Sequence, residues 1–157
     1  GWNFMTLGKF TERCMITLEF ANQHFEGAGY ELTHSRDVLY WRNLLLSLSG
    51  YELHLKTYRS TQYNQNVADQ IIFNKQFPRS TSYCVERIGF YLKKIIQTNR
   101  SDEATSLVKL YGRLYSKIEY ADMEIVREKG IQAYLHEIKT ELFHFNNQLS
   151  QLFFSYA

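Results

Sequence analysis

The stretch Phe77–Ile88 reads Phe-Pro-Arg-Ser-Thr-Ser-Tyr-Cys-Val-Glu-Arg-Ile and holds the only proline among the 157 residues of the chain. Pro78 suits the first position of a helix, where its missing N–H costs nothing. The stretch contains the pair Glu86-Arg87, and the pair Glu12-Arg13 stands near the start of the chain. Small or apolar residues recur at helical spacing around both pairs, at positions 85, 88, 92 and 95 and at positions 11, 14, 18 and 21. This matched phase indicates two helices that share one structural role.

Apolar residues recur at nearly heptad spacing along the whole chain, which is typical of helices that pack side by side. We therefore predict an all-α fold, an antiparallel helical bundle of five to six helices. The predicted helices span residues 4–25, about 33–59 with Thr33 or Ser35 as cap, 67–73, 78–98, 101–118 and 131–156, and residues 120–130 either extend the fifth helix or break it. The residues expected to be buried are Val38, Trp41, Leu45, Leu48, Val85, Ile88, Leu92, Ile138, Leu142 and Phe145.

The composition is that of one folded domain, residues 1–157, with 45% hydrophobic and 22% charged residues. The formal net charge is only +2 and no run of five like charges occurs, which argues against a nucleic-acid surface. No apolar stretch approaches the ~20 residues of a membrane span, so we expect no membrane contact and a cytoplasmic location. Cys14 and Cys84 lie within amphipathic patterns and are predicted to be buried free thiols.

Several segments together resemble the bacterial Alpha-E family, a helical domain of unknown function named for its Glu-Arg signature. The resemblance rests on residues 1–13, on Trp41 with Ser49–Glu52, and above all on residues 67–74 followed by 77–80 and 84–87. The resemblance implies no established activity. It does imply that genes of this family lie beside, or are fused to, genes for ATP-grasp-like ligases and transglutaminase-like peptidases. It therefore implies a role in forming, modifying or recycling peptide amide bonds.

The resemblance also implies that an earlier Glu-Arg helix is missing from this chain. The chain begins with Gly1 and Trp2 rather than with methionine. We therefore expect it to be the C-terminal half of a longer protein. Apolar surface uncovered on the first helix, or on the regular last helix, would favour a homodimer.

Six residues are candidates for a binding site: Glu12, Arg13, Arg79, Ser80, Glu86 and Arg87. Adjacent residues on a helix point about 100° apart, so each glutamate needs a partner other than the arginine that follows it. In one hypothesis the two helices exchange structural ion pairs, Glu12 with Arg87 and Glu86 with Arg13. In a second, the arginines bind an anion or a peptide carboxylate, which the guanidinium fork suits. In a third, a glutamate is catalytic. Arg79 and Ser80 either form an anion site at a helix start or cap that helix.

The sequence gives little support for a metal site, a catalytic nucleophile or a phosphate-binding loop. Glu31–His34 and Glu141–His144 have the Glu-x-x-His spacing of di-iron bundles, but the first lies in a glycine-containing turn and the second flanks an apolar seam. His136-Glu137 lacks the second histidine of a zinc peptidase helix, and His24 and His54 are interpreted as surface or edge residues. We find no nucleophile motif and no phosphate-binding glycine loop. We expect no metal, no cofactor and no catalytic residue.

Two functions remain. The favoured one is a non-catalytic binding or accessory module that serves an ATP-grasp ligase or a transglutaminase-like peptidase. The alternative is an enzyme, or half of one, whose Glu/Arg site is completed by a missing N-terminal half. A cleft in which several arginines and glutamates converge would favour the enzyme, and mutually satisfied pairs would favour the module.

Overall fold

The computed structural model describes residues 1–98 and 101–156 of the chain. These residues form eight helices and no strand: α1 (Trp2–Gly27), α2 (Val38–Ser47), α3 (Tyr51–Thr57), α4 (Tyr63–Phe73), α5 (Thr81–Thr98), α6 (Asp102–Glu119), α7 (Met123–Lys129) and α8 (Ile131–Tyr156). The predicted all-α class is confirmed. The predicted number of five to six helices is wrong, because residues 33–59 contain two helices and residues 120–130 contain a separate one.

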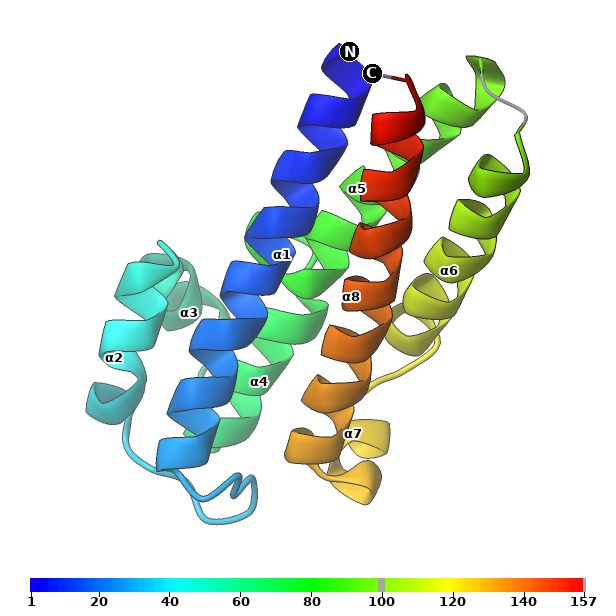
Figure 1. The fold of residues 1–157 in the computed structure, drawn as a ribbon. Coiled ribbons are helices and arrows are strands. Elements are labelled where there is room, and N and C mark those ends of the chain that lie inside the picture. Colours follow the sequence, from blue (N-terminus) through cyan, green and yellow to red (C-terminus); the bar gives the residue numbers. More distant parts are fainter. Residues whose placement is uncertain (99–100, 157) are drawn as a thin grey trace.

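The four long helices lie lengthwise beside one another (Figure 1). α1 packs against α5 and α8, and α6 packs against the same two helices. The rings of Phe4 and Phe153 are in contact, and Glu19 is paired with Lys139, so α1 and α8 run in opposite directions. The short helices α2, α3 and α4 gather around the C-terminal half of α1, and α7 contacts α8 and α4 (Figure 1).

The start of α2 differs from the prediction because another residue caps it. The carboxylate of Asp37 accepts a hydrogen bond from the backbone N–H of Tyr40 at 3.2 Å. Thr33 and Ser35 precede this cap and stay outside the helix. An aspartate at this position satisfies one of the N–H groups that a helix start leaves free.

A left-handed residue, followed by a glycine that packs against a distant part of the chain, marks the break between α2 and α3. Ser49 adopts a φ of 58°, which ends α2 in a left-handed turn. The Cβ that any other residue would place at Gly50 would lie 2.8 Å from the ring of Phe77. Any residue other than glycine at position 50 would therefore have to displace this buried phenylalanine.

Three further boundaries differ from the prediction. α4 begins at Tyr63, earlier than the predicted Val67, and polar side chains in its first turn donate to backbone carbonyls of the loop between α1 and α2. Pro78 does not take the first helical position, since it lies in the turn that precedes α5 at Thr81. Residues 120–130 break the fifth predicted helix, and Asp122 caps α7 by accepting from a backbone N–H.

Two buried amides hold the α2–α4 region together. The side chain of Asn64 accepts from the indole of Trp41 at 2.8 Å and donates to the carbonyl of Glu31 at 2.7 Å. The side chain of Gln70 donates to the carbonyl of Gly50 and contacts Nδ1 of His54 at 2.8 Å. The expectation that His54 is a surface or edge residue is wrong: it is buried, and burial lowers its pKa. These partners explain how polar side chains are accommodated in the core.

The residues expected in the core are buried with one exception. Trp41, Leu45, Leu48, Val85, Ile88, Leu92, Ile138, Leu142 and Phe145 are buried. Val38 is half-buried, because it is the first residue of α2 and lies beside the surface loop that leads into that helix. Leu142 is fully enclosed, whereas its neighbour Phe143 is 52% exposed.

Replacement of Leu142 by alanine should lower the free energy of unfolding by about 2–5 kcal/mol, because it leaves a cavity in the core. The matched control Phe143→Ala should change it by less than about 0.5 kcal/mol, because that ring faces solvent. Urea denaturation of both variants gives the comparison. Equal losses for the two variants would contradict the assignment of the buried face of α8.

Candidate functional site

The two helices that carry the Glu-Arg pairs pack directly against each other and run antiparallel. Trp2 at the start of α1 contacts the ring of Tyr91 late in α5, with 5.6 Å between ring centroids. Farther along α1, the hydroxyl of Thr17 donates to the carbonyl of Arg79, just before α5, at 2.9 Å. Between these contacts the two Glu-Arg pairs come to the same level of the interface, which we call the α1–α5 seam.

The two arginines of these pairs occupy related positions in the seam. The charge of Arg13 acts on the thiol of Cys84, which precedes Arg87 by three residues. In turn, the guanidinium of Arg87 lies over the ring of Phe10, which precedes Arg13 by three residues. Each arginine therefore faces the position one turn before its counterpart. The two helices whose matched phase the sequence indicates therefore pack against each other, with each arginine close to the other helix.

Aromatic rings surround the two arginines. The guanidinium carbons of Arg13 and Arg87 lie 5.1 and 5.8 Å from the centroid of Phe10. Arg87 also lies 4.8 Å from the centroid of Phe90 and 5.2 Å from that of Tyr91, and it donates to the hydroxyl of Tyr91 at 3.1 Å. Cation–π contacts of this kind hold a guanidinium in place without neutralising its charge.

The glutamates of the pairs point away from the seam. Glu86 pairs with Lys75 at 2.9 Å, and Lys75 also reaches Glu119 of α6 at 3.1 Å. Glu12 is exposed and lies one heptad before Glu19, whose partner is Lys139 of α8. Within residues 1–98 and 101–156, no ion pair joins Glu12 to Arg87 or Glu86 to Arg13. The predicted exchange of partners is therefore wrong, although Glu86 does form an ion pair outside its own helix.

Arg79 and Ser80 have different roles at the start of α5. Ser80 is fully buried, and its hydroxyl accepts from the backbone N–H of Tyr83 at 3.0 Å, so it caps the helix. The side chain of Arg79 is half-buried, and its charge acts on Cys84, as that of Arg13 does. In the described part of the chain, Arg13, Arg79 and Arg87 form no ion pair with a carboxylate. Of the six candidates, the structure thus brings the three arginines together along the seam.

The aromatic and cationic residues that accompany Arg87 are not among the six candidates predicted from the sequence. Phe90, Tyr91 and Lys94 follow it at the third, fourth and seventh positions, which is the spacing of one helix face. The amine of Lys94 lies 4.5 Å from the ring centroid of Phe90. This spacing was visible in the sequence and could have extended the candidate site along α5.

The two cysteines lie beneath the arginines and are chemically protected. Both are free and fully buried. Burial raises the pKa of the Cys84 thiol to about 12, although the charges of Arg13 and Arg79 act in the opposite direction. Burial also raises the pKa of Cys14, and Cys84 adds to that effect. Neither thiol is an activated nucleophile, because a reactive cysteine has a depressed pKa.

Two further observations concern metal ions and membranes. Within residues 1–98 and 101–156, no group of three or more histidine, cysteine, aspartate or glutamate side chains is placed to hold a metal ion. None of the helices in the described ranges has both the length and the apolar character needed to cross a membrane. The seam itself offers positive charge, hydrogen-bond donors and aromatic surface.

At pH 8 a thiol-specific chromogenic reagent should label neither cysteine of the folded protein, because both side chains are buried and burial raises the pKa of both thiols. The same protein in guanidinium chloride should release two equivalents. Since folding raises the Cys84 pKa above the usual 9.0, the free energy of unfolding should fall as pH rises from about 9 towards 12. Rapid labelling of the folded protein would contradict the buried placement of the thiols.

Comparison with curated proteins and with solved structures yields no match for this chain. A family model does match it over residues 1–154, essentially the whole length. That family, Alpha-E, is described as a predicted alpha-helical domain with a conserved ER motif. The two Glu-Arg pairs of this chain have the residues of that motif, and they lie at one level of the α1–α5 seam. The chain therefore belongs to the Alpha-E family.

Proposed function

We propose that this chain is a non-catalytic binding module whose α1–α5 seam holds a carboxylate of a peptide. One observation carries the proposal: three half-buried arginines lie along the seam, and in the described part of the chain none of them is paired with a carboxylate. A cluster of like charges is unfavourable unless a counter-charge is supplied. An anionic ligand would supply it.

The geometry of the arginines favours a carboxylate over a diffuse anion. A guanidinium binds a planar carboxylate through two parallel N–H···O bonds. Arg87 uses one N–H for the hydroxyl of Tyr91, which fixes its orientation and leaves other donors for a ligand. The rings of Phe10 and Phe90 hold the fork in place, so less side-chain entropy is lost on binding.

The resemblance to Alpha-E proteins supports a peptide as the ligand. We propose that the partner is an ATP-grasp-like ligase or a transglutaminase-like peptidase in the cytoplasm. A ligase of this kind consumes a carboxylate to form an amide bond, and a peptidase releases one. A module that holds the carboxylate end of a peptide would serve either enzyme.

Replacement of Arg87 by lysine should weaken peptide binding by about tenfold or more, because lysine keeps the positive charge but cannot donate the two parallel hydrogen bonds of a guanidinium. The probe is an acetylated tripeptide with a free C-terminal carboxylate, titrated by isothermal calorimetry, and its C-terminal amide should bind far more weakly. Arg113→Lys is the matched control, because Arg113 is an exposed arginine on α6, away from the seam. The melting temperature should be nearly the same in all three proteins.

Two results would count against the module. Equal affinity for the tripeptide acid and for its C-terminal amide would mean that the seam does not recognise a carboxylate. Hydrolysis of ATP or of a peptide by the pure chain, lost on Glu12→Gln or Glu86→Gln, would instead favour the enzyme alternative. The calorimetric and activity assays use the same protein preparation, so the two outcomes can be separated.

A further inference from the structure

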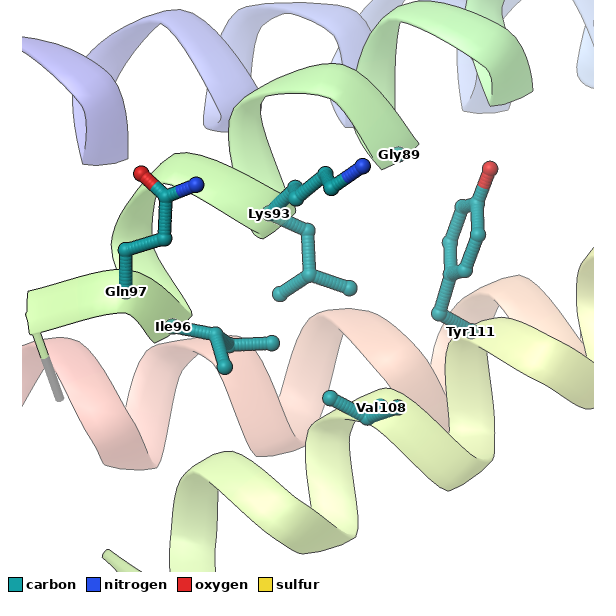
Figure 2. Close-up of a pocket in the computed structure, with 7 residues that line it drawn as sticks. Gly89, Lys93, Ile96, Gln97, Val108 and Tyr111 are labelled. Carbon is teal, nitrogen blue, oxygen red and sulfur yellow. The ribbon is translucent and has the colours of Figure 1, made fainter. Parts of the chain in front are cut away.

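A second candidate site lies on the opposite flank of α5, between α5 and α6. It is a hollow of about 430 Å³ that opens to solvent. Its lining consists of Gly89, Leu92, Lys93, Ile96, Gln97, Val108 and Tyr111. Figure 2 shows the side chains of Ile96 and Val108 facing each other across the space, with Lys93 and Gln97 on the α5 side and Tyr111 at one end. Binding sites for small molecules fall within roughly 300–1,000 Å³.

A glycine and a tyrosine shape one end of this hollow. A Cβ at position 89 would overlap the hydroxyl of Tyr111, so only glycine lets this tyrosine approach α5. The Tyr111 hydroxyl donates to the backbone carbonyl of Val85 at 2.9 Å, which holds the ring upright as an end wall. Glycine is unfavourable inside a helix. At this position it gives α5 a close contact with Tyr111 and leaves the space beside that contact open.

The chemistry of the hollow is amphipathic. Leu92, Ile96 and Val108 supply an apolar floor, and Val108 is 42% exposed although it belongs to that floor. Lys93 and Gln97 supply a cation and an amide at the rim. Within the described ranges Lys93 forms no ion pair. An apolar ligand with one anionic end matches this distribution.

Two nearby acidic groups are paired with another lysine. Glu86 and Glu119 lie close enough to Tyr111 to help burial raise its pKa. Both glutamates are bound by Lys75, on the side of Tyr111 that leads away from the hollow. Lys93 is therefore the charge that an anionic group would meet at the rim.

The shape favours a linear ligand over a compact ring. The α5 lining runs from Gly89 to Gln97, which is about 12 Å at a rise of about 1.5 Å per residue. A cavity of about 150 Å³ holds benzene, and this hollow is almost three times as large. An extended chain of roughly eight to ten carbons, with bonds of about 1.5 Å, has the matching length.

We propose that the hollow between α5 and α6 binds a straight-chain monocarboxylate of about eight to ten carbons, with the chain on the apolar floor and the carboxylate at Lys93. This site is separate from the α1–α5 seam. Arg87, Phe90 and Lys94 occupy the α1 side of α5, and Gly89, Lys93 and Ile96 occupy the α6 side. The proposal therefore holds or fails independently of peptide binding at the seam.

The test is an NMR titration of the full chain with decanoate below its micelle concentration, followed at the backbone amide of Gly89. Decanoate should give a saturable shift there. Decanol should bind about tenfold or more weakly, because it lacks the charge that Lys93 pairs with. Butyrate should show no saturation, because each lost methylene weakens binding by about fourfold.

Three variants make the test specific. Lys93→Met should weaken decanoate binding about tenfold and leave decanol unchanged, whereas the control Lys109→Met on α6 should leave both unchanged. Val108→Phe should abolish binding by filling the hollow, and circular dichroism should show that it folds, because Val108 is partly exposed. Arg87→Lys should have no effect. A titration without saturation at Gly89, or equal affinities for wild type, Lys93→Met and Val108→Phe, would overturn the proposal.

Discussion

The antiparallel packing of α1 against α5 is the constraint on which the rest of this structure depends. It brings two Glu-Arg pairs, far apart in the sequence, to one level, where Arg13 faces Cys84 and Arg87 faces Phe10. Because adjacent helical residues point about 100° apart, an arginine directed into the seam sends its glutamate outward. One packing contact thus decides the environment of all four charges.

The outward glutamates and the inward arginines have different physical roles. Glu86 joins α5 to α6 through Lys75, and Lys75 and Glu86 are both nearly half exposed. Ion pairs with this much exposure contribute about 0–1 kcal/mol, so the apolar core provides most of the stability. The arginines instead rest on aromatic rings, where they keep their charge and their donors. The feature of the motif best suited to a ligand is therefore its arginine.

Much of the fold could be predicted, because the long helices have apolar stripes that are local in sequence. α8 begins at Ile131 as predicted, and α6 begins at Asp102, one residue after its predicted start. The close packing of Gly50 against Phe77 at the break between α2 and α3 could not be predicted, because Phe77 is distant in sequence. His54 was misread for the same reason: its buried partner Gln70 lies on another helix. Local patterns set the helices, and long-range contacts set their interruptions.

The candidate site could be predicted only in part. The sequence identified Arg13, Arg79 and Arg87 from their residue type and position, and the structure places all three along one seam. The sequence could not show that Glu12 and Glu86 point away from the seam, because this orientation depends on which neighbouring helix packs against each side of α1 and α5. The open hollow beside Gly89 was equally hidden, because it arises from how closely Tyr111 approaches α5.

The most direct test of the central claim is to observe the guanidinium groups themselves. In a protein labelled with nitrogen-15 on arginine side chains, the Nε signals of Arg13, Arg79 and Arg87 can be followed while a peptide with a free C-terminal carboxylate is added. If the seam binds the carboxylate, all three signals should shift together with a single dissociation constant, while that of Arg113 stays in place. Shifts at Arg113 alone, or no saturable shift at the three seam arginines, would contradict it.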